Sequence, residues 1–211
     1  SLLYGSRSRG ELLLAGFRAT EASGDYAKTR AMWEQWRRGV SGDSVLLAQA
    51  YHALGRAQLA AGYPDSALRS FSQGLGFIGR SGPLRMGLLA ALGNLAYGSR
   101  RFDNARFYYT DALALAQQSR SLVDESMLRL MIIACDAKSK GVSSADLVKR
   151  CNAVLSTCRD AGFLFGEAVS LFLRARITEP VSDAAAALGN YREALAAYER
   201  LVDVPEEDGE I

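Results

Sequence analysis

The stretch ALGRAQLAAGYPDSALRSFSQGL, from Ala53 to Leu75, recurs further along the chain as ALGNLAYGSRRFDNARFYYTDAL, from Ala91 to Leu113. The two copies align without a gap, and their small and large residues coincide. The matched pairs, each 38 residues apart, are Gly55 and Gly93, Ala67 and Ala105, Phe71 and Tyr109, and Leu75 and Leu113. Self-similarity at a fixed period of this length indicates a repeat architecture.

Each copy contains two helical patterns separated by a short turn. In the first copy, Ala67, Phe71, Gly74 and Leu75 fall at i, i+4, i+7 and i+8, which is one face of a helix. Pro64 suits the first position of that helix. Two antiparallel helices that pack closely need a small residue where they cross, and a bulky aromatic residue fills the adjacent gap. The stretch therefore predicts a tight helical hairpin.

This order of small and large residues resembles the tetratricopeptide repeat (TPR) family, most clearly over residues 45–119. The resemblance implies an all-α fold: a right-handed superhelical solenoid of about five antiparallel helix pairs with a concave face. Repeats of 38 to 42 residues are about one helical turn longer than the family's usual ~34. The chain is therefore similar to the longer-helix members of the family.

We expect one repeat domain over residues 1–203, followed by an acidic tail over 204–211 that is predicted to be disordered. The approximate repeats cover 8–40, 44–80, 83–120, 122–160 and 163–203. Upstream of the quoted stretches, Thr29 and Trp33 repeat the small–large pair, 38 residues before Ala67 and Phe71. Downstream, Leu147, Cys151 and Val154 repeat the pattern of Ala105, Tyr109 and Ala112 after 42 residues.

Local signals set several of the expected helix boundaries. Ser121 with Asp124, and Ser143 with Asp146, predict N-caps of helices over about 122–139 and 144–160. Another helix is expected from about residue 8 to residue 22. The last pair is expected as helices over about 163–177 and 190–203. The longer join between these two helices predicts an insertion or an extra helical turn.

Composition restricts the class of protein. Of the 211 residues, 49% are hydrophobic and 23% are charged, the balance of a soluble globular chain. The most apolar run, Leu128 to Cys135, is too short for a transmembrane span and contains Arg129. Arg7, Arg9 and Glu11 interrupt any N-terminal signal peptide. Three cysteines in helical sequence favour reduced thiols and a cytoplasmic location.

No constellation of residues predicts catalysis, a metal site or a cofactor site. Gly74, Gly76 and Gly79 form a GxGxxG pattern, but a helix precedes it where a dinucleotide site needs a strand. His52 is the only histidine, and Cys151 and Cys158 share one helix face, where packing is the expected role. We therefore expect a protein that is not an enzyme and holds no metal or cofactor.

The resemblance implies that the concave surface is lined by the first helix of each pair. The positions that it places in this partner-binding groove are Arg18, His52, Arg56, Leu59, Asn94, Tyr97, Arg129, Asp136 and Arg174. Arg56 and Asn94 are equivalent in adjacent repeats, so together they could hold a peptide carboxylate or backbone. Ala90 and Ala91 stand where the family's chaperone-tail clamp needs polar residues, so that specialised function is not predicted.

These features favour a non-catalytic protein–protein interaction module that binds a peptide or helix of a partner, as a scaffold or regulatory part of a larger protein. One alternative is the sensory or regulatory domain of a bacterial signalling protein or transcription regulator. RNA binding is a weaker alternative, because residues 1–202 carry a net charge of +7 but show no base-reading code. Self-association, and a tail that folds onto the groove, are left open.

Overall fold

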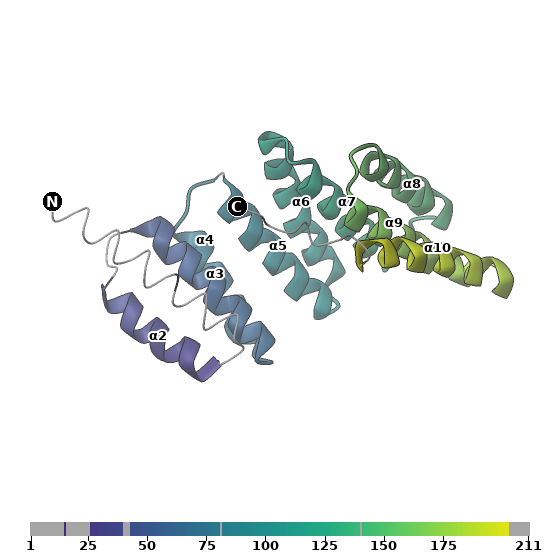
Figure 1. Cartoon of the computed structure of the whole chain (residues 1–211). Helices are drawn as coiled ribbons and strands as arrows, with labels where there is room; N and C mark the ends of the chain where they lie inside the picture. Colours follow the sequence, from purple (N-terminus) through teal and green to yellow (C-terminus); the bar gives the residue numbers. More distant parts are fainter. Residues whose placement is uncertain (1–14, 16–25, 40–42, 81, 140, 203–211) are drawn as a thin grey trace, which may run out of the picture. The chain divides into compact units, whose positions relative to one another are not determined.

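The computed structural model describes residues 15, 26–39, 43–80, 82–139 and 141–202, and within these ranges it contains no strand. Their regular structure consists of nine α-helices and one 3₁₀ turn (Figure 1). The elements are α2 Tyr26–Gly39, α3 Ser44–Ala60, α4 Pro64–Gly76, α5 Pro83–Gly98, α6 Phe102–Ser119, α7 Leu122–Asp136, α8 Ser144–Asp160, α9 Leu164–Thr178, η1 Glu179–Val181 and α10 Ala184–Val202. The all-α class is confirmed. Apart from residue 15, the expected helix over 8–22, with Arg18, lies outside the described residues, as does the tail over 204–211.

The chain divides into two compact units, residues 1–100 and 101–211. In the first unit, α3 packs against α2 and α4, and α4 packs against α5. In the second unit, α7 packs against α6 and α8, and α9 packs against α8 and α10. Within each unit, helices that follow one another in sequence are therefore neighbours in space, which is how helical repeats bury their apolar faces.

The positions that the sequence aligned at 38 and 42 residues are core positions. The side chains at these positions are at most 7% exposed, and they are Thr29 and Trp33, Ala67 and Phe71, Ala105 and Tyr109, and Leu147 and Cys151. A second apolar cluster in the second unit joins Leu155 on α8 to Leu171 on α9 and Ala194 on α10. The register read from the sequence therefore identifies the buried face of α2, α4, α6 and α8.

Glycine allows close approach of helices in the first unit. A Cβ atom on Gly55 would lie 2.4 Å from Cε1 of Phe71, so the ring of α4 occupies the space that a side chain on α3 would need. A Cβ atom on Gly74 would lie 3.1 Å from Leu88 on α5 and 3.3 Å from Tyr51 on α3. The small–large packing expected from the repeat is therefore present in the α3–α4 hairpin.

Capping interactions define the ends of the helices. Ser121 and Ser143 accept hydrogen bonds from the backbone N–H groups of Asp124 and Asp146, so both predicted N-caps are confirmed. The α8 bounds agree with the prediction, whereas α7 ends at Asp136. The expected start of the last helix near residue 190 was wrong. Helix α10 begins at Ala184, because Asp183 caps the alanine run with a 2.8 Å hydrogen bond from Ala186 N–H.

Besides Gly82 and Gly141, four residues in the connections between helices have positive φ. These residues are Gly62, Arg100, Arg120 and Gly162, with φ of 81°, 58°, 54° and 66°. In three of the turns, the next residue donates its N–H to a carbonyl five positions earlier, as in Tyr63 to Gln58 at 2.8 Å. This backbone bond satisfies a terminal carbonyl of the preceding helix, as in a Schellman motif. Glycine adopts the required conformation without strain, but arginine does not.

Two further properties bear on function. Among the described helices, none has the combination of length and apolar character that crossing a bilayer requires. The cysteines Cys135, Cys151 and Cys158 are all buried free thiols, and burial raises the pKa of Cys135 and Cys151 to about 11. Thiols in this state pack as small apolar groups and are poor nucleophiles.

Candidate functional site

A hollow of about 340 Å³ lies in the second unit, between α6, α7 and α8. Its lining is mostly apolar, and the apolar contributors are Leu113 from α6, Leu122, Ile132 and Ile133 from α7, and Ala153 and Val154 from α8. Small apolar clefts with a few polar groups at the edge are the usual form of a binding site. The hollow can therefore accept an apolar side chain of a ligand.

Charged side chains line the same hollow. Arg129 donates to Oε1 of Glu125 one turn earlier on α7, with Nη2 at 2.7 Å and Nε at 3.0 Å. The Arg129 side chain is 48% exposed, and surface pairs of this kind contribute little stability. Its guanidinium can therefore exchange the Glu125 carboxylate for a carboxylate of a ligand at low energetic cost. Arg129, one of the predicted groove residues, thus borders the hollow.

Asp136 fixes the second arginine of the hollow. The carboxylate is buried at the end of α7, and its Oδ2 accepts a 2.7 Å hydrogen bond from Nη1 of Arg150 on α8. Its Oδ1 lies 3.6 Å from Nη1 of Arg106 on α6 but accepts no hydrogen bond from the described residues. Asp136 was predicted to face a groove. In the structure it is buried, and it positions Arg150 beside the hollow.

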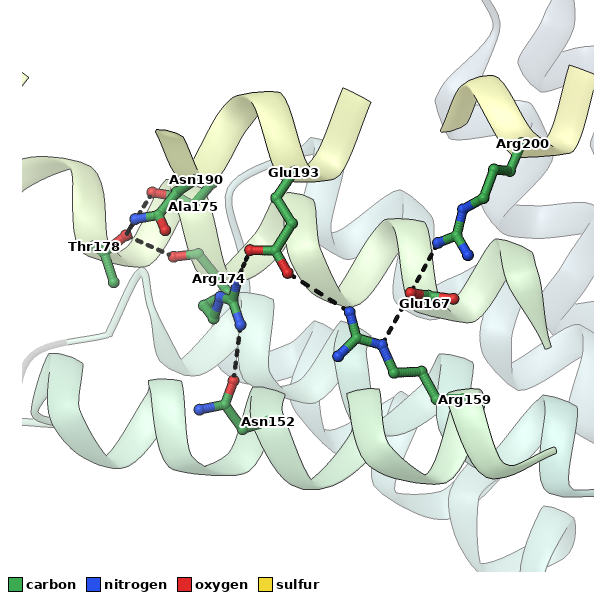
Figure 2. A network of polar contacts seen from close by, with 9 residues as sticks. All are labelled: Asn152, Arg159, Glu167, Arg174, Ala175, Thr178, Asn190, Glu193 and Arg200. Carbon is green, nitrogen blue, oxygen red and sulfur yellow. Dashed lines mark hydrogen bonds and ion pairs between the residues drawn. The ribbon is translucent and has the colours of Figure 1, made fainter. Parts of the chain in front are cut away.

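A second polar feature, centred on Glu167 of α9, joins three helices (Figure 2). The Glu167 side chain is only 7% exposed, and its Oε1 accepts from Nε of Arg159 on α8 at 2.9 Å and pairs with Nη2 of Arg200 on α10 at 2.8 Å. Burial alone would raise the pKa of Glu167, but hydrogen bonds from Arg200 and Arg159 outweigh it and hold the pKa below 4.5. Glu167 is therefore a carboxylate at neutral pH.

The same network continues to Arg174, another predicted groove residue (Figure 2). Glu193 on α10 pairs with Arg174 and, at 3.6 Å, with Nη2 of Arg159. Nη1 of Arg174 lies 3.4 Å from Oδ1 of Asn152 on α8. The Arg174 side chain is 19% exposed and is held from both sides. This network, from Arg200 to Asn152, therefore links α8, α9 and α10 and has a structural role.

The remaining predicted groove residues lie in the first unit. His52 is half-buried on α3, with its ring centroid 5.8 Å from that of Phe71. Its Cε1 lies 3.8 Å from the position that a Cβ atom on Gly87 would occupy, so the His52 ring lies against α5. The other four are Arg56 and Leu59, exposed on α3, and Asn94, exposed, and Tyr97, half-buried, on α5. These five residues thus come from two helices of one unit.

The glycine-rich segment has the environment of a helix end. Gly74 and Gly76 belong to α4, and Gly79 follows it. A phosphate site needs these glycines at the start of a helix, where backbone N–H groups are free. The segment instead ends a helix, as the sequence predicted.

Most of the hollow was not predicted from the sequence. Arg129 was expected in a groove, but Leu122, Ile132 and Ile133 were not, although their spacing along α7 places them on one broad face with Arg129. Arg150 was also missed, because its place beside the hollow depends on Asp136, a contact between helices that no local pattern encodes. A mixed apolar and charged stripe on α7 was the available signal.

Comparison with known proteins supports the fold alone. No family model matches this chain, and no curated protein matches it. TPR-like repeats assigned to a kinesin light chain of Podosopora anserina superpose with a TM-score of 0.71 at 13% identity, covering 92% of this chain and 97% of theirs. A variant form of the same repeats gives a TM-score of 0.73 at 12% identity, with the same coverage. BtubC (BKLC) from P. vanneervenii gives 0.73 at 15% identity, covering 94% of this chain and 82% of its own.

These neighbours place the chain among TPR-like helical repeat folds. The resemblance to TPR proteins is therefore one of fold, and the identity of any partner must be argued from the surface itself.

Proposed function

We propose that this chain is a non-catalytic protein-interaction module that binds a peptide or helix of a partner protein, as a scaffold or regulatory part of a larger cytoplasmic protein. The observation that carries the proposal is the apolar hollow between α6, α7 and α8, with Arg129 and Arg150 beside it. A hollow of this size can hold one or two side chains of a partner.

Recognition would combine burial with charge. An aliphatic or aromatic side chain of the partner enters the hollow against Ile132 and Val154, which contributes about 1.5–3 kcal/mol. A neighbouring carboxylate of the partner pairs with Arg129 in place of Glu125. Arg150 is held by Asp136, so it supplies a positive charge of fixed position. The preferred ligand is therefore a segment with an apolar residue next to an acidic one.

The first unit offers a separate contact surface. The proposal assigns Arg56 and Leu59 on α3, and Asn94 and Tyr97 on α5, to contacts with a peptide carboxylate or backbone. Arg56→Ala or Asn94→Ala should then lower partner affinity while the circular dichroism spectrum stays unchanged. If both variants bind the partner as the wild type does, these residues do not form a binding surface.

Peptide display tests the hollow directly. A library of random 12-residue peptides is selected on the immobilised wild-type chain, and recovered peptides are measured by titration calorimetry. Ala153→Trp fills the hollow from an exposed position of α8 and should weaken these peptides at least about tenfold. Ser156→Trp, exposed on the same helix but outside the hollow, is the matched control and should bind normally.

Arg129→Ala separates the charge contribution from the apolar one. It should weaken acidic peptides about three- to tenfold and leave peptides without a carboxylate unchanged. Peptides that bind Ala153→Trp as tightly as the wild type would show that the hollow is not the binding site.

A further inference from the structure

Helix α10 carries an exposed apolar stripe. Its members recur every seven residues and are Leu188, Leu195 and Val202, which are 52%, 58% and 84% exposed. Tyr191 lies beside the stripe, and its ring is 6.2 Å from the ring of Phe172 on α9, itself 40% exposed. Side chains seven residues apart lie on the same face of a helix. The α10 stripe, Leu188, Leu195 and Val202, therefore lies along one face of the helix.

On α8, the positions equivalent to Leu195 and Val202 are packed against other helices. Aligning the buried residues Leu147 of α8 and Ala194 of α10 places Val148 with Leu195, and Leu155 with Val202. Val148 is half-buried against an apolar cluster, and Leu155 is 4% exposed in contact with residues of α9 and α10. On α8, this face is therefore packed against neighbouring helices. On α10, no described residue covers it.

We infer that a second copy of this chain covers the α10 stripe, with the two α10 helices packed antiparallel about a two-fold axis at Leu195. The stripe is symmetric about its central residue, because Leu188 and Val202 each lie seven residues from Leu195. An antiparallel pair therefore places Leu195 against Leu195 of the other copy, and Leu188 against Val202. Self-complementarity of this kind is what a two-fold interface requires.

Charge next to the stripe supports the same orientation. Arg192 and Glu199 are exposed on one flank of the stripe, three residues before and four residues after Leu195. In an antiparallel pair, the same flanks of the two helices face each other, as at matching positions of a coiled coil. Arg192 of each copy then meets Glu199 of the other, which gives two ion pairs. Neither residue forms an ion pair with another described residue.

The first experiment measures the mass of the full chain in solution. Sedimentation equilibrium should show a concentration-dependent dimer below about 100 µM. Leu195→Glu places two carboxylates at the two-fold axis and should weaken the dimer at least about a hundredfold, with an unchanged helical spectrum. A wild-type chain that stays monomeric at these concentrations overturns the inference, as does a dimer that Leu195→Glu leaves intact.

Charge reversal identifies the occupant as a second copy. Arg192→Glu alone creates two Glu–Glu contacts in the dimer, and Glu199→Arg alone creates two Arg–Arg contacts, so each variant should dimerise about tenfold more weakly. Mixing the two single variants restores both ion pairs, so a mixed dimer should form at wild-type strength. The double variant, Arg192→Glu with Glu199→Arg, should also recover. Failure of the mixture and of the double variant to recover contradicts the antiparallel pairing and indicates a different partner helix.

Discussion

The α3–α4 hairpin of the first unit and the α8–α9 hairpin of the second have the same type of turn between their two helices. The two turns lie one hundred residues apart in the sequence. Gly62 and Gly162 both have positive φ, and the residue that follows each donates a 2.8 Å hydrogen bond to a carbonyl five positions back. The two hairpins therefore share a backbone turn. They differ in which helix supplies the space for close packing.

In the first hairpin the glycine lies before the turn, and in the second it lies after it. Gly55 on α3 makes room for the Phe71 ring of α4, whereas Gly166 on α9 makes room for Sγ of Cys158 on α8 and for the ring of Phe163. A Cβ on Gly166 would lie 2.4 Å from that ring and 2.6 Å from the sulfur. Close packing of the two helices thus requires a glycine at the contact, and either helix of the hairpin can carry it.

The hairpins also differ in their polar contacts. Between α3 and α4, Oγ of Ser70 donates one buried 2.7 Å hydrogen bond to Oε1 of Gln58. Between α8 and α9, the Arg159–Glu167 pair belongs to a charged network that also includes α10. Steric packing is therefore the main contribution to the stability of the first hairpin, and in the second hairpin ion pairs contribute as well. The stability of the two hairpins should respond differently to substitution and to pH.

The largest expected effect comes from closing the space in the first hairpin. Gly55→Ala places a methyl group 2.4–2.9 Å from the Phe71 ring and should lower the free energy of unfolding by about 3 kcal/mol. Urea unfolding followed by circular dichroism measures this loss, and hydrogen exchange should localise it to the first unit.

Two variants test the cause. Phe71→Leu in the Gly55→Ala background should recover part of the loss, because the smaller side chain leaves room for the methyl group. Gly76→Ala is the control, since a Cβ there meets nothing within 4 Å. If the Gly55→Ala protein were as stable as the wild type, close packing of Gly55 against the Phe71 ring would not determine the stability of this hairpin.

The next largest effect comes from the charged network. Glu167→Gln keeps the shape of the side chain but removes its charge, so the pairs with Arg159 and Arg200 weaken. We expect a loss of about 1–3 kcal/mol, confined by hydrogen exchange to the second unit. If Glu167→Gln destabilised the first unit by the same amount, the charged network would not act on the second unit alone.

The pH dependence of this difference has a defined sign. The pKa of Glu167 is lower in the folded chain than its ordinary value of 4.5, so the carboxylate stabilises the fold above that pH. As the pH falls through the folded pKa, the carboxylate is protonated and this contribution is lost. Urea midpoints of the wild type and Glu167→Gln should therefore converge below pH 4.5 and stay constant relative to each other above about pH 6. A difference that does not shrink as the pH falls below 4.5 would mean that charge is not its source.

The smallest effect concerns the turns that lack glycine. Arg100 and Arg120 adopt the same positive φ as Gly62 and Gly162, at a steric cost that glycine avoids. Arg120→Gly should raise the free energy of unfolding by about 0.5–1 kcal/mol, and Gly162→Ala should lower it by a similar amount. Thermal unfolding midpoints compare the two, and a destabilised Arg120→Gly would indicate that its side chain contributes contacts beyond the turn.

Much of the fold could be read from the sequence, because it depends on local rules. The 38-residue spacing of Ala67, Phe71, Ala105 and Tyr109 identified buried positions, and serine caps set the starts of two helices. The start of α10 was missed, since the alanine run after Asp183 has no apolar periodicity of its own. Gly166 was also missed, because it lies on the opposite side of its turn from Gly55.

The candidate site was harder to predict for a physical reason. Its features depend on side chains from three helices that meet in space, such as Arg150 held by Asp136 beside Arg129. A family register assigns directions to single helices, so it placed Asp136 on a surface although interhelical pairing buries it. Ion-pair partners and hollows between helices are properties of the packed structure and leave no pattern in one segment.

The distribution of two rare residue types has a practical consequence. Both tryptophans, Trp33 and Trp36, belong to the first unit, and all three cysteines belong to the second. Indole fluorescence therefore reports melting of residues 1–100, while the rate of thiol alkylation reports opening of residues 101–211. The natural chain thus contains two independent spectroscopic and chemical reporters, and its halves can be followed in one sample without a label.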